Sequence, residues 1–142
     1  MASKPESTFI ASVHRHLPPP TKLYRQKNHD EFNAGVADCW YSGPCRDLWV
    51  EYKFLSDGKI PVRAAVDLVT KQRYLSSLQL DWLNERHSEG RNVWVIVGCK
   101  DGGVVYRKRE WELQFSPDVF REFLMSRARL ASEIERFVGV KP

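Results

Sequence analysis

Asp38, Glu51 and Lys53 are the residues of this chain whose types and spacing point most directly to chemistry. Carboxylate and carbonyl oxygens are the ligands that Mg²⁺ and Mn²⁺ prefer. Asp38 and Glu51 could supply two carboxylates, and the backbone carbonyl of Tyr52 could supply a third oxygen. Lys53 could orient the attacking water, help to deprotonate it or stabilise the transition state. Such a set is what metal-dependent hydrolysis of a phosphodiester bond requires.

Two of these residues lie in a segment, residues 47–54, that alternates like a β-strand. Its apolar face consists of Leu48, Val50, Tyr52 and Phe54. Its other face carries Trp49, Glu51 and Lys53. Two strand steps separate the acid from the base by about 7 Å on that face. One face is therefore expected in the core, and the other is expected to present the acid and the base together.

The segments around this strand predict one α/β domain over residues 1–142, with a mixed sheet covered by helices. We expect helices over residues 4–17 and 76–90, and strands over residues 36–41, 93–97 and 104–106. The strand over 36–41 carries Asp38 and forms a hairpin with the strand over 47–54. Residues 60–73 fit either a strand or a helix. A terminal helix is expected from Ser116, with its inward face formed by Phe120, Phe123, Leu124, Ile134 and Phe137.

Composition narrows the class of protein without choosing a function. The chain has 142 residues, a net charge of +4 and a pI near 9.0, which permits a nucleic-acid partner without requiring one. No apolar run is long enough to span a bilayer, and the first residues lack the apolar stretch of a signal peptide. We therefore expect an intracellular, cytoplasmic protein without a membrane partner. Three scattered cysteines indicate reduced thiols and no zinc site.

The sequence resembles the PD-(D/E)XK nuclease superfamily in Asp38 and in the run Val50-Glu51-Tyr52-Lys53. The lead-in Gly35-Val36-Ala37-Asp38 and the helix with Ser76 and Gln79 are similar to those of VRR-NUC domains, although position 37 is Ala where those domains usually have Pro. The resemblance implies a restriction-endonuclease-like fold, hydrolysis of DNA with Mg²⁺ or Mn²⁺, and a preference for branched DNA. Many stand-alone members of this subgroup are encoded by phages, in which case the compartment would be the host cytoplasm.

Two further residues have both a structural and a functional interpretation. Glu6 fits a capping box with Ser3, yet it also lies on the inward stripe of its helix, and the resemblance implies that an acid there completes the metal shell. Gln79 fits a capping box with Ser76, and the resemblance implies a glutamine in the active site at that position. Asp38 and Glu51 have plainer interpretations too, as an acid beside a turn and as a solvent-facing partner of Lys53.

Basic residues suitable for DNA phosphates occur at Lys22, Arg25, Lys27, Lys71 and Arg73. Further basic clusters lie at Arg63 and at residues 107–109, and an ordinary solvated surface explains each cluster equally simply. Tyr24 and Tyr74, placed among the basic residues, could stack on unpaired bases.

The sequence as a whole favours a metal-dependent endonuclease similar to Holliday junction resolvases, with Asp38, Glu51, Lys53 and Gln79 in catalytic roles. Asp38, Glu51, the Tyr52 carbonyl and Glu6 are the expected metal ligands. Symmetric cutting of a junction would favour a homodimer. One alternative is a nuclease that acts on linear DNA ends or single strands. Another is a DNA- or protein-binding module that has the same fold and no catalysis.

Overall fold

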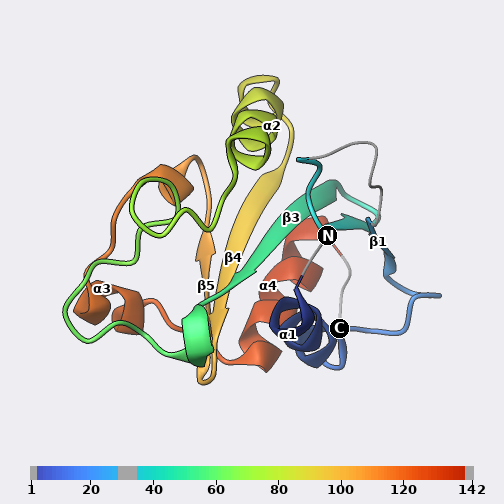
Figure 1. Ribbon diagram of the computed structural model, residues 1–142. Helices are drawn as coiled ribbons and strands as arrows, with labels where there is room; N and C mark the ends of the chain where they lie inside the picture. Colours follow the sequence, from blue (N-terminus) through green and yellow to red (C-terminus); the bar gives the residue numbers. More distant parts are fainter. Residues whose placement is uncertain (1–2, 29–34, 140–142) are drawn as a thin grey trace.

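The computed structural model describes residues 3–28 and 35–139 and contains a five-stranded mixed sheet (Figure 1). The strands are β1 (Tyr24–Lys27), β2 (Cys39–Ser42), β3 (Asp47–Phe54), β4 (Val93–Cys99) and β5 (Gly102–Tyr106), and their order in the sheet is their order in the chain. Neighbouring strands are antiparallel except β3 and β4, which are parallel. The connection between these two must cross over the sheet, and it contains a helix.

Helices cover both faces of the sheet. They are α1 (Lys4–His14), α2 (Ser77–Ser88), α3 (Pro117–Glu122) and α4 (Arg127–Val138), with short 3₁₀ turns η1 (Ser56–Gly58) and η2 (Glu110–Glu112). One buried cluster joins α1 and α4 to one face, as Figure 1 shows. A second cluster joins α2, α3 and the segment over residues 55–75 to the other face. The expected fold class, a mixed sheet flanked by helices, is confirmed.

Strand β3 lies in the middle of the sheet and has the two faces that its alternation predicts. Val50 and Tyr52 belong to the cluster beneath α1 and α4. Trp49 packs toward the cluster beneath α2, and Glu51 shares that face because side chains two residues apart point the same way. Glu51 is not the solvent-facing residue of the plainer interpretation, since it is 1% exposed.

Several element boundaries differ from the sequence-based expectations. Helix α1 ends at His14, three residues before Leu17, and the strand expected from Val36 begins only at Cys39, so that Asp38 directly precedes β2. The ambiguous segment 60–73 forms neither a helix nor a strand, and Val66 makes an isolated bridge with Phe115.

The expected single terminal helix is wrong, because α3 and α4 are separate. Met125 interrupts them by pairing with Gly103 of β5, with N–H···O distances of 2.8 and 2.9 Å. Ser126 then caps α4 through the backbone N–H of Arg129. Phe123, expected to face inward, is 55% exposed at the break. The backbone bonds to β5 therefore override a helical pattern that continues through the sequence.

Within the described ranges, no helix combines the length and apolar character needed to cross a lipid bilayer.

Candidate active site

Asp38 and Glu51 come together on the face of the sheet that α2 partly covers. The β2–β3 ladder ends with Cys39 opposite Val50, so the next residue on each strand is one of the two acids. The carboxylate of Asp38 accepts the backbone N–H of Tyr52 at 2.9 Å. Both acids are buried, with exposed fractions of 8% and 1%. Two carboxylates from separate strands therefore share one buried position.

The backbone carbonyl of Tyr52 faces the same edge of β3 as Asp38. Trp49 donates its backbone N–H to Asn92 at the start of β4, so the odd-numbered residues of β3 bond toward β4. In a strand, the N–H and C=O of one residue point to the same side, and the next residue points to the other. Tyr52 therefore faces the β2 side, where the pairing has already ended at Val50. Its carbonyl therefore lies on the edge of β3 that also holds the carboxylate of Asp38.

The two oxygens of Glu51 have different surroundings. Oε2 is 3.2 Å from the Nζ of Lys53 and accepts a hydrogen bond from the Nε2 of Gln79 at 3.1 Å. Oε1 is buried and accepts no hydrogen bond from an N–H or O–H donor among the described residues, and a hydrogen bond with the carboxyl of Asp38 is one cause of the raised pKa of Glu51. Buried polar atoms are nearly always hydrogen-bonded, so an exception in a carboxylate indicates a missing ligand.

Electrostatics favour a proton on Glu51 when no cation is bound. Burial raises the pKa of Glu51 well above its usual range, the charge of Asp38 raises it further, and Lys53 lowers it. Two carboxylates in contact inside a protein cannot both be charged without a compensating positive charge. Lys53 supplies one such charge, and a divalent cation would supply more.

Gln79 completes the predicted capping box and also contacts Glu51. Its Oε1 accepts the backbone N–H of Ser76 at 3.0 Å, and the Ser76 hydroxyl accepts the Gln79 N–H at 3.2 Å, which completes a capping box. Its Nε2 simultaneously binds Glu51. The same amide therefore begins helix α2 and holds one oxygen of the candidate site.

Gly35, three residues before Asp38, packs against helix α2. Gly35 has φ +96°, and a Cβ at this position would lie 2.7 Å from the carbonyl oxygen of Leu78. Only glycine fits a backbone that is both left-handed and this close to another chain segment. Gly35 thus brings the chain entering Asp38 against the first turn of α2, next to Gln79.

Glu6 lies near the acids but is less well placed. It is half-buried, and its pKa is raised by burial, lowered by the charge of Lys53 and raised by that of Asp38. Ser3 caps its backbone N–H at 3.4 Å, as the sequence predicted. Among the described residues, no group of three or more His, Cys, Asp or Glu side chains is arranged to hold a metal ion. The donor set is therefore two carboxylates and a carbonyl, which suits Mg²⁺ because this ion usually keeps several waters.

The basic residues singled out in the sequence lie in different places. Lys22 and Lys27 are exposed, and the guanidinium of Arg25 is bonded to the carbonyl of Pro18 at 2.8 Å. Arg25 and Lys27 lie opposite buried residues of the α1-side cluster, so their side chains leave β1 on the face away from Asp38.

The other two predicted basic residues lie on the α2 side. Lys71 and Arg73 are exposed. Arg73 lines a cavity of about 540 Å³ together with Ser76 and Leu80, at the start of the helix that carries Gln79. This pair is therefore on the same side of the sheet as the acids.

Sequence reasoning missed a second buried polar chain behind the acids. The hydroxyls of Tyr41 and Tyr52 are 2.6 Å apart, and the Tyr41 hydroxyl is 2.7 Å from the Nε2 of His14. Burial and the charges of Arg25 and Lys27 lower the pKa of His14 to about 4. Nothing in the local pattern signals this chain, because its members come from three elements.

Sequence reasoning also missed Asp67, which is 2% exposed. It accepts hydrogen bonds from the backbone N–H groups of Val69 and Thr70, from the Thr70 hydroxyl and from Gln114. Burial raises its pKa, but these bonds, together with one from Lys71, leave it below its usual range. Asp67 therefore organises the loop, and the Asp-x-x-Thr spacing was the available signal.

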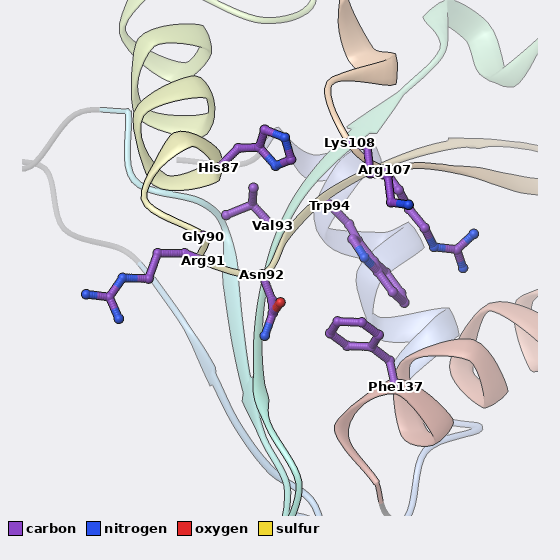
Figure 2. Close-up of a pocket in the computed structure, with 9 residues that line it drawn as sticks. All are labelled: His87, Gly90, Arg91, Asn92, Val93, Trp94, Arg107, Lys108 and Phe137. Atoms are coloured by element: carbon purple, nitrogen blue, oxygen red, sulfur yellow. The ribbon is translucent and has the colours of Figure 1, made fainter.

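A cavity of about 270 Å³ lies away from the acids, around the first residues of β4 (Figure 2). Arg107 stacks over the ring of Trp94, and Phe137 packs beside that ring in the same view. Arg91 and Lys108 extend from its border. This hollow contains none of the predicted catalytic residues, and its basic border gives it a different character from the acidic site.

Comparisons with known proteins identify the fold. No protein-family model matches the sequence, and no curated protein matches it. Among solved structures, the chain is similar to Archaeoglobus fulgidus Hjc, a Holliday junction resolvase from an archaeal hyperthermophile, with a TM-score of 0.51. The match covers 93% of this chain and 99% of that chain at 11% identity. The two proteins share a fold. At this identity the fold alone is established, so any function must be argued from the residues.

Proposed function

We propose that the chain is a divalent-metal-dependent endodeoxyribonuclease that acts on branched DNA. The single observation that carries this proposal is the buried Glu51, whose Oε1 lacks a partner while Asp38 lies beside it. Two buried carboxylates beside one lysine leave a negative charge uncompensated, which a divalent cation would neutralise. The proposal includes two narrower expectations from the sequence, namely a VRR-NUC-type domain and a phage origin.

The donor set fits Mg²⁺ or Mn²⁺. Asp38, Oε1 of Glu51 and the carbonyl of Tyr52 would hold the ion, and Glu6, whose pKa responds to the charges of Lys53 and Asp38, would complete the shell. When bound, such an ion activates water and neutralises charge on the scissile phosphate. Ion binding needs Glu51 as a carboxylate, so it would displace the proton that burial favours.

Lys53 and Gln79 have roles at the other oxygen of Glu51. Both bind Oε2, which keeps the carboxylate from rotating and leaves Oε1 facing the site. Lys53 is 7% exposed, and its ammonium can in addition donate to the attacking water or to a phosphate oxygen. In this scheme Asp38 and Glu51 bind the metal, Lys53 is catalytic, and Gln79 positions Glu51.

Branched DNA is the proposed substrate because the chain shares its fold with a Holliday junction resolvase. A two-fold symmetric junction needs two cuts, so we also propose a homodimer with one site in each copy. A DNA substrate implies an intracellular location, which is the host cytoplasm if a phage encodes the protein. One domain over residues 1–142 would carry the whole activity.

The proposed phosphate contacts divide between two sides of the sheet. Lys71 and Arg73 lie on the side of the acids and are the best placed to hold the strand being cut. The remaining predicted basic residues, of which Arg25 is half-buried, and the basic border in Figure 2 would contact more distant arms; they are Lys22, Arg25, Lys27, Arg91 and Lys108. Such contacts add affinity largely without regard to base sequence.

The decisive experiment is cleavage of a labelled four-way junction, a linear duplex and a single strand, each with Mg²⁺, Mn²⁺ or EDTA. Glu51→Gln removes the charge while keeping the shape. Glu122→Gln, an exposed acid on α3, is the matched control. We expect metal-dependent cleavage of the junction by the natural sequence and by Glu122→Gln, and none by Glu51→Gln.

Two other outcomes decide the alternatives. Metal-dependent cleavage confined to the linear duplex or the single strand would replace branched DNA with ends or single strands as the substrate. No cleavage of any DNA by the natural sequence, with either metal, would refute the enzyme and leave a binding module with a nuclease-like fold.

A further inference from the structure

Four aromatic side chains form a continuous row across the face of the sheet that carries the acids. Tyr24 on β1 contacts Trp40 on β2, with ring centroids 5.6 Å apart. Trp40 contacts Trp49 on β3 at 6.0 Å, and Trp49 contacts Trp82 on α2 at 5.4 Å. We call these four residues the aromatic row.

The outer half of the aromatic row is not part of the hydrophobic core. Trp49 and Trp82 pack against the buried cluster beneath α2, whereas Tyr24 and Trp40 belong to neither buried cluster. Tyr24 is 51% exposed, and Trp40 is half-buried. Core packing therefore explains the inner two rings but not the outer two.

The aromatic row runs beside the pair of acids. Trp40 and Trp49 are directly opposite each other in the β2–β3 ladder. Two residues before Trp40 on the chain is Asp38, and two residues after Trp49 is Glu51, so all four side chains lie on one face. Two strand steps span about 7 Å, so the rings and the carboxylates form neighbouring lines on the sheet.

We propose that the aromatic row binds an unpaired base of the DNA substrate, directly beside the phosphate that is cut. This inference rests on the proposed nuclease function and adds a substrate feature to it. Every base has a flat face that stacks on aromatic rings, and this stacking is a main source of affinity for unpaired strands. A base is joined to its phosphate by one sugar, so a base on the outer rings leaves its phosphate within reach of the acids.

The occupant is an unpaired base because a paired one has no face to offer. In a duplex both faces of each base are stacked on neighbours, and contact with a face requires the base to leave the stack. Branch points, forks and single strands supply such bases at low cost. The aromatic row therefore selects DNA with an unpaired or easily opened base next to the cut.

The test measures binding without cleavage, in EDTA, by fluorescence anisotropy of two labelled probes. One probe is a short oligothymidylate, and the other is a blunt duplex of two fully complementary strands. Tyr24→Ala and Trp40→Ala each remove an outer ring, and Trp40→Phe keeps one. Phe123→Ala, which removes an exposed aromatic ring on the distant segment after α3, is the matched control.

We expect each outer-ring alanine variant to weaken oligothymidylate binding by about tenfold or more and to leave duplex binding nearly unchanged. Trp40→Phe should recover most of the affinity, and Phe123→Ala should match the natural sequence. Tyr24 lies on a short edge strand and is half exposed, so its variant keeps the test decisive if Trp40→Ala does not fold.

Equal binding of oligothymidylate by Tyr24→Ala and the natural sequence would overturn the inference. So would equal losses for both probes, or a change in oligomeric state without a change in DNA affinity, which would identify the aromatic row as a surface between copies. These results are distinct from failure of the proposed function, which is absence of cleavage by the natural sequence itself.

Discussion

Strand β3 has a buried polar arrangement on each face, and the two differ in one respect. On the α1 side, the hydroxyls of Tyr41 and Tyr52 and the ring of His14 form an unbroken hydrogen-bonded chain. On the α2 side, Lys53 and Gln79 satisfy one oxygen of Glu51 and leave the other without a partner. The first arrangement is complete within the protein, and the second is not.

This difference distinguishes a network that stabilises the fold from a site that a group outside the protein would complete. A satisfied buried network stabilises one particular fold and needs nothing else. A buried carboxylate without a partner lowers stability, and we expect it where something outside the protein completes the site. Each of the following predictions tests one half of this contrast.

Glu51→Gln should give the largest effect, with opposite signs in two measurements. Cleavage should fall by about 10³-fold or more, because a metal ligand is lost. The free energy of unfolding without metal should rise by about 1–2 kcal/mol at neutral pH, because folding of the natural sequence must either take up a proton on Glu51 or bury its charge beside Asp38, and a neutral amide requires neither. The sign follows from the raised pKa of Glu51: the folded state holds its proton to higher pH than the unfolded state, so this group lowers stability as the pH increases.

Urea unfolding in EDTA, measured beside the cleavage assay, checks the prediction. A variant that is less stable than the natural sequence would mean that Glu51 serves mainly as a structural partner of Lys53, and the contrast between the two faces would be lost.

Acidification should destabilise the hydrogen-bonded network on the α1 face of the sheet, through protonation of His14. Its pKa is about 4 in the folded protein against 6.5 in the unfolded chain, so the unfolded state binds more protons between these values. Stability should therefore fall as the pH drops from about 6.5 to 4, by up to about 3 kcal/mol from this group. Urea unfolding at several pH values measures the slope.

His14→Gln should flatten that slope, and His16→Gln, an exposed histidine two residues away, should leave it unchanged. An identical slope in His14→Gln and the natural sequence would show that other groups control the acid response.

Tyr41→Phe should cost about 1–3 kcal/mol of stability, because it removes the middle hydroxyl and leaves His14 and Tyr52 without this partner. Cleavage at a temperature well below unfolding should change little, since the acids lie on the other face. Thermal unfolding with a parallel activity assay checks both. A large loss of activity in a folded Tyr41→Phe protein would mean that the two faces are coupled through Tyr52.

Tyr106→Phe is the counterpart of Tyr41→Phe, because it removes a buried hydroxyl that has no partner among the described residues. We expect it to have the smallest effect. The hydroxyl of Tyr106 is buried without a hydrogen-bond partner in the described part of the chain, so removing it should leave stability unchanged or raise it by up to about 1 kcal/mol. Thermal unfolding beside Tyr41→Phe makes the comparison. A clear loss of stability in Tyr106→Phe would show that partners in the protein are a poor guide to the cost of a buried hydroxyl here.

Much of the fold could be predicted because local rules agree with tertiary contacts in most elements. Alternation over residues 47–54 gave the central strand and its two faces, and the Ser76 capping box gave the start of α2. The prediction failed where a tertiary contact decides the structure. The apolar pattern after Ser116 continues as one helix, and only the backbone bonds between Met125 and Gly103 divide it.

The sequence could predict that the candidate site residues lie together, but not how they are bonded to one another. The spacing of Asp38, Glu51 and Lys53 was enough to expect them together. Which oxygen of Glu51 remains without a partner depends on Gln79, which is 28 residues away and on another element. The pairing of rings in the aromatic row depends on strand register, which the sequence of any one strand does not contain.

Gln79 shows how two unrelated selective pressures can act on one position. A capping box accepts either glutamate or glutamine at the third helical residue, so the start of α2 alone would tolerate both. Glutamate would put a third negative charge against Glu51, where the Nε2 of Gln79 now donates a hydrogen bond. The helix rule therefore allows two amino acids at this position, whereas the hydrogen bond to Glu51 allows only glutamine.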